Sequence, residues 1–361
     1  MAAQYTIKAP RKNGVAVKKP GLFVRFLKFL FPWKGDGVID VIRKLIFLIA
    51  LAVFIITAVP LLMDVYSMYK DQWDNERLIQ IYNPEGSTGG EKTGEILPSF
   101  KELLAINPET VGYIRIKGTN IDYPVVQHED NDYYLDHDFY GEPNRSGCIM
   151  LDYKCKVAPE GNSANLVLYG HHMAVGTYFA NLKWYWDSIY NDYDNPMSYY
   201  KEHPLITFNT IYEEAQWKIF AIDLFNTEER YGEVYNYNNK HDFTSREDFN
   251  NFIIDIMDRS DVFTDVDIQY GDEILTLSTC VWPWRGDMEN VRLGIFARKV
   301  RPGESTDVNV DAVVRNPGVY RWQWVYDNVN GGNWSYSSWD RRKLLSYTEE
   351  DALKDGYTFI S

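Results

Sequence analysis

One uninterrupted apolar run limits what this 361-residue chain can fold into more than any other feature. Leu45–Met63 contains 19 residues and no charged side chain. A helix of that length spans about 28 Å at about 1.5 Å per residue, close to the roughly 30 Å hydrocarbon thickness of a bilayer. A buried helix of a soluble protein is the alternative, but such helices normally carry polar residues on one face. We therefore predict one transmembrane helix, the anchor, over residues 45–63.

Charge is distributed unequally on the two sides of this run. Residues 1–44 contain ten Lys and Arg against two Asp, a net charge of +8, whereas the whole chain carries −14, which leaves −22 for the remainder. Because positive charge is retained on the cytoplasmic side, we expect residues 1–44 to be a cytoplasmic basic segment and the C-terminal bulk to lie outside the cell. The length of the basic segment disfavours a cleavable signal peptide. The acidic remainder argues against nucleic acid as a partner, since a polyanion would be repelled.

Composition divides the part after the anchor into three regions. Residues 64–95 are polar and include a Gly- and Ser-containing stretch, which is typical of a stalk and linker. Residues 96–300 contain the expected folded domain, and residues 301–361 form an aromatic-rich C-terminal extension with four Trp. Two Trp-containing segments of the extension flank Asn330–Asn333, a pattern typical of a hairpin loop. We favour packing of these Trp residues against the domain over binding of a sugar or a partner.

Eight short segments of the domain have strand character. Each is rich in Val, Ile, Tyr and Phe and is bounded by Gly, Asn or Asp. These segments are residues 111–116, 121–127, 147–152, 164–169, 205–209, 215–224, 273–279 and 292–300. Their number and length predict a mainly β fold, a closed or nearly closed barrel. One helix interrupts them, because Ser245 and Asp248 form a capping box before apolar residues at helical spacing.

A cysteine and two arginines near the end of the domain are candidates for chemistry. Cys280 follows the strand 273–279, and Arg285 and Arg292 come after it. A Cys that closes an apolar strand is most often a buried small hydrophobe, but a nearby cation can stabilise its nucleophilic thiolate form. Either arginine could hold a developing oxyanion, and the alternative is that it pairs with surface carboxylates.

A pair of histidines follows another predicted strand. His171 and His172 come directly after the strand 164–169 and Gly170. A histidine at such a strand end can give a proton to a departing amine or take one from an incoming amine near neutral pH. A structural role or adventitious metal binding is the alternative interpretation. The other histidines have no ligand spacing, so we predict no metal site, and we expect no cofactor.

These elements together resemble the signatures of sortases, and of class B in particular. The helix predicted after Ser245 is placed as it is in that class, and the similarity covers about Ile96 to Val300. The residues that carry it are Leu277-Ser278-Thr279-Cys280 with a following Arg, Tyr169-Gly170-His171-His172-Met173, and the segments 107–114, 118–127 and 132–135.

The resemblance implies an eight-stranded sortase barrel with inserted helices and a membrane-bound cysteine transpeptidase of Gram-positive bacteria. It assigns Cys280 as the nucleophile, His171 as the acid and base, and Arg292 as the active-site arginine of the family. Ser278 and Thr279 are implied to line the substrate groove. The implied reaction cleaves a surface protein's sorting signal after Thr through a thioacyl enzyme. An amine of a cell-wall precursor or a pilin then accepts the acyl group.

Two other functions stay open at this point. One is a cysteine endopeptidase with water as the acceptor, and the other is a non-catalytic wall- or pilus-associated module that uses the aromatic extension. Three features depart from class B: the Trp-rich stretch after Cys280, the extension itself, and a pair of cysteines. Cys148 and Cys155 either form a disulfide outside the cell or remain two free thiols.

Overall fold

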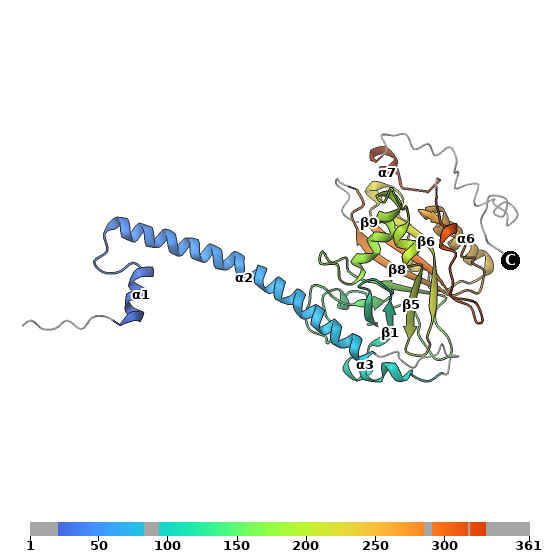
Figure 1. Cartoon of the computed structure of the whole chain (residues 1–361), viewed down its shortest axis with the longest axis horizontal. Coiled ribbons are helices and arrows are strands. Elements are labelled where there is room, and N and C mark those ends of the chain that lie inside the picture. Colours follow the sequence, from blue (N-terminus) through green and yellow to red (C-terminus); the bar gives the residue numbers. More distant parts are fainter. Residues whose placement is uncertain (1–20, 83–93, 285–290, 317, 330–361) are drawn as a thin grey trace, which may run out of the picture. The chain divides into compact units, whose positions relative to one another are not determined.

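The computed structural model describes residues 21–82, 94–284, 291–316 and 318–329. It divides into two units, one ending at Tyr69 and one beginning at Lys70. The first unit contains α1 (Leu22–Leu30) and the first part of the long helix α2 (Val38–Ile81), drawn in blue in Figure 1. Among the described residues, Val38–Met63 is the one helical stretch long and apolar enough to cross a membrane. The predicted anchor lies within this stretch.

The polar residues that we expected to form a stalk are helical as far as Ile81, because α2 continues through them. The last turns of α2 belong to the second unit and pack against the barrel. Leu78 and Tyr82 are buried there, and the Tyr82 ring stacks on Tyr113 with centroids 3.7 Å apart. Composition alone does not predict this contact, because only a few apolar residues of the polar segment make it. The remainder of the expected linker, residues 83–93, lies outside the described residues.

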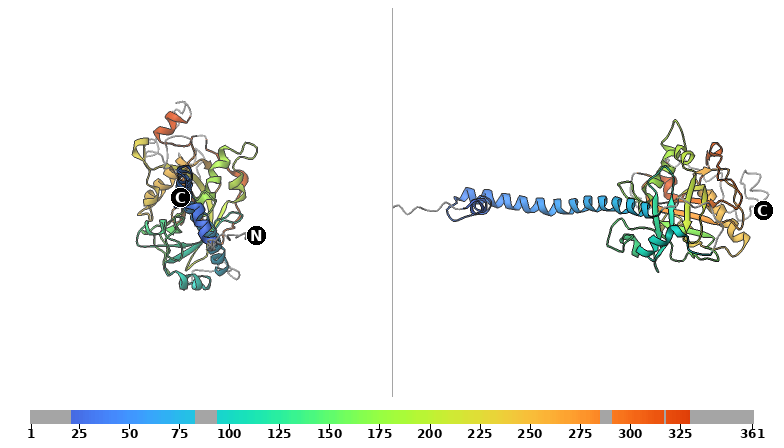
Figure 2. Two further views of the ribbon diagram at one scale, coloured as in Figure 1. Left: turned by 90° about the vertical axis from the view of Figure 1, so that its left-hand side faces the viewer. Right: turned by 60° about the horizontal axis from the view of Figure 1, so that its bottom comes forward.

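All eight predicted strands form, and they close into a barrel in the order β1-β2-β3-β4-β8-β9-β6-β5, which confirms the predicted fold (Figures 1 and 2). Neighbouring strands are antiparallel except for the pairs β2–β3 and β4–β8, which are parallel. The strands are β1 (Thr110–Arg115), β2 (Asp122–Val126), β3 (Ile149–Leu151), β4 (Asn165–Tyr169), β5 (Leu205–Thr210), β6 (Gln216–Asn226), β8 (Ile274–Val281) and β9 (Val291–Lys299).

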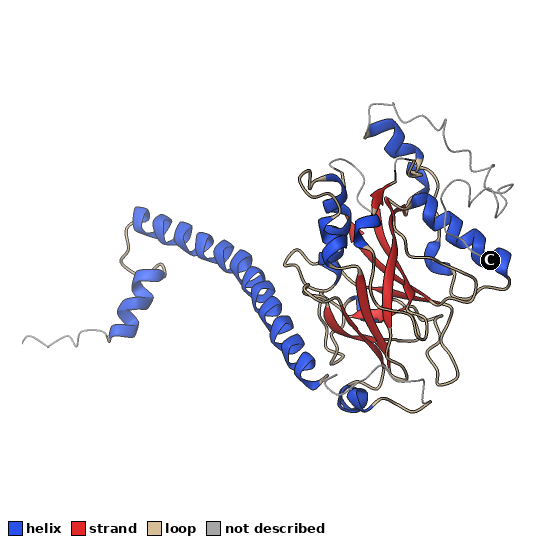
Figure 3. Cartoon of the chain, turned by 45° about the vertical axis from the view of Figure 1, so that its right-hand side comes forward, coloured by secondary structure: helices blue, strands red, loops and turns tan. Residues whose placement is uncertain are grey.

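Helices lie around the outside of this sheet (Figure 3). The predicted late helix is confirmed: the Ser245 side chain accepts a hydrogen bond from the backbone N–H of Asp248, and four apolar residues of the helix are buried. Two helices between β4 and β5 were not predicted. The helices are α3 (Lys101–Ile106), α4 (Lys183–Tyr190), α5 (Ser198–Glu202), α6 (Arg246–Arg259) and α7 (Gln323–Asn328).

The described part of the C-terminal extension packs against the domain, as we favoured. Its strand β10 (Val314–Arg315) pairs with β7 (Val262–Phe263), and Trp322 is buried in the barrel core. The predicted hairpin is wrong in its first arm, because residues 323–328 form the helix α7. The second arm, with Trp334 and Trp339, lies outside the described residues.

Candidate active site

Two of the predicted catalytic side chains lie opposite each other on adjacent strands. Cys280 of β8 pairs directly with Arg292 of β9 in the antiparallel register. Side chains that are directly opposed in this way project from the same face of the sheet, with Cβ atoms about 4.5–5.5 Å apart. Both residues are partly exposed. The barrel register therefore brings a thiol and a guanidinium together at an accessible position, whereas Arg285 lies outside the described residues.

The third predicted residue, His171, follows the strand on the other side of β8. The parallel β4–β8 ladder ends with Tyr169 opposite Ser278, and Gly170 extends it by donating its N–H to the Ser278 carbonyl at 3.2 Å. His171 and Cys280 each come two residues after this last pair. Because side chains alternate between the faces of a strand, Cys280 projects from the face that carries Ser278, while His171 lies just beyond the end of β4. Cys280 and Arg292 are thus paired across β8 and β9, and His171 follows the end of the neighbouring strand β4.

Gly170 is required where the chain passes the ring of Phe179. A Cβ atom at Gly170 would lie 2.7 Å from that ring, well inside van der Waals contact. The Phe179 backbone N–H also donates to the His171 carbonyl at 3.0 Å. The close approach and the hydrogen bond together fix the main chain that presents His171.

The two histidine rings have different environments. Nε2 of His171 lies 2.8 Å from the carbonyl oxygen of Leu135. A carbonyl only accepts, so this contact assigns the hydrogen to Nε2 and leaves Nδ1 as the basic nitrogen of the neutral ring. His172 is half-buried, and its Nδ1 donates to the Cys280 carbonyl at 2.8 Å. Burial lowers the pKa of His172 and so favours the neutral imidazole, which supports the backbone of Cys280 through this hydrogen bond.

Tyr237 is part of the site although the sequence analysis did not identify it. Its hydroxyl lies 2.6 Å from Oγ of Ser278, and it is close enough to Cys280 and Arg292 for both to affect its pKa. Burial is the main cause that raises the pKa of Tyr237 to about 12, so the phenol stays neutral. Tyr237 lies in a short 3₁₀ turn far from Cys280 in the sequence, and no motif marks it.

Ser278 and Thr279, the two residues implied to line the groove, are buried. The Ser278 hydroxyl bonds to Tyr237, and Oγ1 of Thr279 donates to the Gly170 carbonyl at 2.8 Å. These contacts hold β8 against its neighbours. The structure thus places both hydroxyls in the framework of the site and leaves Cys280 as the accessible residue of this segment.

A buried carboxylate supports the end of β4. The Tyr169 hydroxyl donates to Asp152 at 2.8 Å, and Asn238 donates to the Tyr169 oxygen at 3.1 Å. Burial alone would raise the pKa of Asp152, but His241 and several hydrogen bonds outweigh it and lower the pKa to about 2. Asp152 is therefore a carboxylate that fixes Tyr169, two residues before His171.

A cavity of about 240 Å³ is lined in part by the residues that directly follow Cys280. Its lining includes an acidic side chain, basic side chains and two indole rings, so it can receive a polar group of a peptide. The residues around it are His172, Lys183, Trp186, Asp187, Val281, Trp282 and Pro283.

Comparison with known proteins identifies this arrangement. Residues 114–300, just over half of the chain, match the Sortase domain family. The chain belongs to the sortase family. Sortase B of Listeria monocytogenes is 29% identical to this sortase over 237 residues, which cover 66% of this chain and 89% of that protein. Sortase B of Staphylococcus aureus is 31% identical over 185 residues, which cover 51% of this chain and 68% of that protein.

A solved structure gives the same answer. The Staphylococcus aureus sortase B–substrate complex superimposes with a TM-score of 0.54 at 28% identity, covering 65% of this chain and 99% of that one. The resemblance to class B is therefore confirmed, and this sortase is a cysteine transpeptidase.

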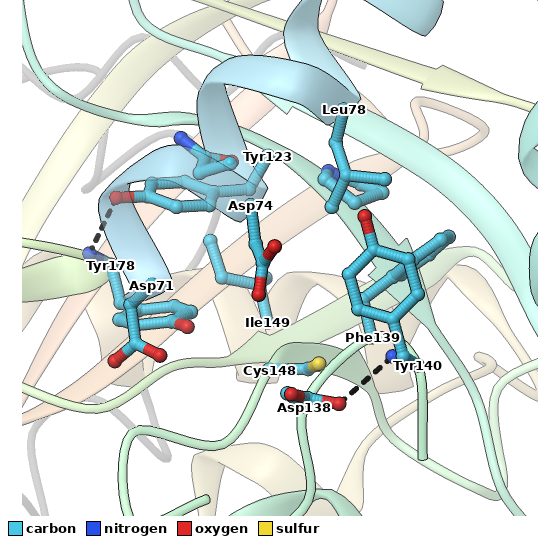
Figure 4. A pocket seen from close by; sticks show the side chains of 12 residues that line it. Asp71, Asp74, Leu78, Tyr123, Asp138, Phe139, Tyr140, Cys148, Ile149 and Tyr178 are labelled. Carbon is cyan, nitrogen blue, oxygen red and sulfur yellow. Dashed lines mark hydrogen bonds between the residues drawn. The ribbon is translucent and has the colours of Figure 1, made fainter. Parts of the chain in front are cut away.

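The other two cysteines of this sortase are free thiols. The Cys155 thiol donates to the Asn165 carbonyl at 3.4 Å, and burial raises its pKa to about 12. Cys148 lines a cavity of about 30 Å³ with Tyr178 and with Asp71 of α2 (Figure 4). Burial raises the pKa of Cys148 well above its usual range. Both of these thiols are buried and remain protonated, which leaves Cys280 as the accessible thiol.

Proposed function

We propose that this sortase is a membrane-anchored transpeptidase that cleaves a sorting signal after Thr and transfers the acyl group to an amine of a cell-wall precursor or a pilin. The observation that carries the proposal is the strand register that sets Cys280 opposite Arg292, beside the strand β4 that His171 follows, in a chain of this family. The accessible thiol, the base and the cation have the roles that such a reaction requires.

In the first half of the reaction, the Cys280 thiolate attacks the carbonyl carbon of the signal's Thr. A C–S bond forms, and the carbonyl oxygen becomes an oxyanion that the Arg292 guanidinium stabilises. Protonated His171 then gives its Nδ1 proton to the departing amine as the C–N bond breaks. A thioester on Cys280 and a neutral His171 remain.

In the second half, an amine attacks the thioester carbonyl and His171 takes the proton that the amine loses. The C–S bond breaks, the sulfur leaves as a thiolate stabilised by Arg292, and a new amide links the acyl group to the acceptor. The proton taken up by His171 restores the starting state of the site. The half-buried His172 and the buried hydroxyls of Ser278 and Thr279 position Cys280 during both steps.

We place the catalytic domain outside the cell and the basic N-terminal segment in the cytoplasm. The apolar helix Val38–Met63 supports a single membrane anchor, and the net charge of +8 in residues 1–44 supports this orientation. An anchored domain on the outer face would meet both surface proteins with C-terminal sorting signals and wall precursors or pilins. The Staphylococcus aureus relative has been solved in complex with its substrate, which supports a substrate site in this domain.

The experiment uses the full chain in detergent with Thr-containing sorting-signal peptides and an amine acceptor, followed by mass spectrometry. We expect a ligated product and, at early times, a thioacyl adduct on Cys280. The Cys280→Ala variant should form neither, whereas Cys148→Ala, a matched removal of a buried thiol, should retain both. Ligation by Cys280→Ala would refute the assignment. Cleavage that ignores added amine would instead identify an endopeptidase.

A further inference from the structure

Two Trp-containing segments of this sortase, distant in the sequence, meet in space. The ring of Trp284, in the connection that follows Cys280, lies 5.7 Å from Trp322 and 6.2 Å from Trp324, centroid to centroid. Both partners belong to the C-terminal extension, beyond the matched family domain, which ends at residue 300. Trp284 also contacts Trp186 of α4 at 6.2 Å with the two rings nearly perpendicular. We call these four residues the indole cluster.

The extension is fastened to the domain independently of this cluster. Arg321 forms a buried ion pair with Asp261 and donates to the Arg259 carbonyl at 3.0 Å. The Asn316 side chain donates to the Ser260 carbonyl at 2.8 Å, and its backbone N–H donates to the Asp261 carbonyl at 2.9 Å. These contacts connect the extension to the junction of α6 and β7. Trp322 and Trp324 are therefore held by the barrel framework.

The cluster continues directly into the active site. Trp282, two residues before Trp284, lies 5.4 Å from the ring of His172, which in turn bonds to the Cys280 carbonyl. Trp282 and Trp186 both line the 240 Å³ cavity, together with Val281, the residue after Cys280. The Trp282 side chain is 57% exposed, so few contacts of its own hold it. A displacement of Trp284 would thus move the wall of the cavity.

We propose that the C-terminal extension positions the active site: Trp322 and Trp324 hold Trp284, and Trp284 holds the segment 282–284 in the conformation that binds substrate beside Cys280. The inference rests on the proposed transpeptidation for its readout. Trp284, Trp322 and Trp324 are positioning residues, since none of them carries a proton or a nucleophile in the reaction. The extension acts on substrate binding and leaves the reactivity of the thiol unchanged.

The test compares Trp284→Ala, Trp324→Ala and the double variant in the full chain in detergent. Loss of one aromatic pair should raise the KM of the sorting peptide or of the amine about threefold to tenfold. Because Trp284→Ala already removes the contact that Trp324→Ala removes, the double variant should resemble Trp284→Ala instead of showing the product of the two effects. Trp324→Phe keeps a ring and should restore most of the wild-type KM.

Two controls separate positioning from general stability. Alkylation of Cys280 by iodoacetamide should proceed in each variant within about twofold of the wild-type rate, since the thiol and its strand are untouched. Tyr193→Ala removes an aromatic ring that is 89% exposed and outside the cluster, and it should leave KM unchanged. Unchanged KM values in both Trp variants, with or without a lower Tm, would overturn the proposal. A wild-type chain that does not ligate peptides would contradict the proposed function instead.

Discussion

Replacing Arg321 by Met removes one charge from a buried cluster and tests whether the extension is part of the folded domain. Arg321 is 3% exposed and its partner Asp261 is fully buried. Asp223 is also fully buried, and both residues influence its pKa. The substitution keeps the aliphatic bulk of the side chain but leaves two buried carboxyl groups with less compensating positive charge.

Breaking a buried ion pair from one side costs about 3–5 kcal/mol. A domain of this size loses about 2–4 °C of Tm per kcal/mol, so Tm should fall by about 6–20 °C. The assay is thermal unfolding of the full chain in detergent, followed by near-UV circular dichroism. The matched variant Arg321→Met/Asp261→Asn should regain part of the loss, because it carries one fewer uncompensated buried charge.

The deficit should also depend on pH. Burial raises the pKa of both Asp223 and Asp261 above the usual value, while Arg321 opposes this shift. Without Arg321 both pKa values rise further, so the folded variant binds more protons than the unfolded chain and becomes less stable as pH increases. The loss relative to wild type should be larger at about pH 8 than at about pH 5. An unchanged Tm, or the same loss at both pH values, would refute the reasoning.

Three further substitutions test the site and its framework. Arg292→Ala should lower kcat/KM about 100- to 1000-fold in the ligation assay, because the oxyanion loses its cation, and a rate near wild type would remove Arg292 from the mechanism. Gly170→Ala would place a Cβ 2.7 Å from the Phe179 ring. We expect the unfolding free energy to fall by about 1–3 kcal/mol and ligation to become slower. If both the unfolding free energy and the ligation rate are unchanged, the close approach is contradicted. Ser245→Ala removes the hydrogen bond to the Asp248 N–H and should cost about 1 kcal/mol in chemical denaturation without changing kcat, while a change in kcat would connect α6 to catalysis.

Features that are encoded locally could be read from the sequence. The eight strands are short apolar segments between turn residues, and each formed close to its expected bounds. The Ser245 cap and the anchor run are likewise properties of a few consecutive residues. That His171 and Cys280 act in one site is a prediction from the family resemblance, because the strands that lead to them, β4 and β8, are distant in the chain.

Contacts between distant segments were decided by the tertiary structure. The barrel register put Arg292 opposite Cys280, and folding buried Tyr237 against Ser278 without any sequence motif. The same is true of the extension: the sequence does not distinguish Trp322 from the other aromatic residues, and only the folded structure shows that its ring contacts Trp284. By itself the sequence determined the strand pattern, the apolar run of residues 45–63 and the reactive residue types, since these follow from the properties of neighbouring residues. Closure of the sheet decided which side chains meet, because pairing between strands is a long-range property that no local pattern contains.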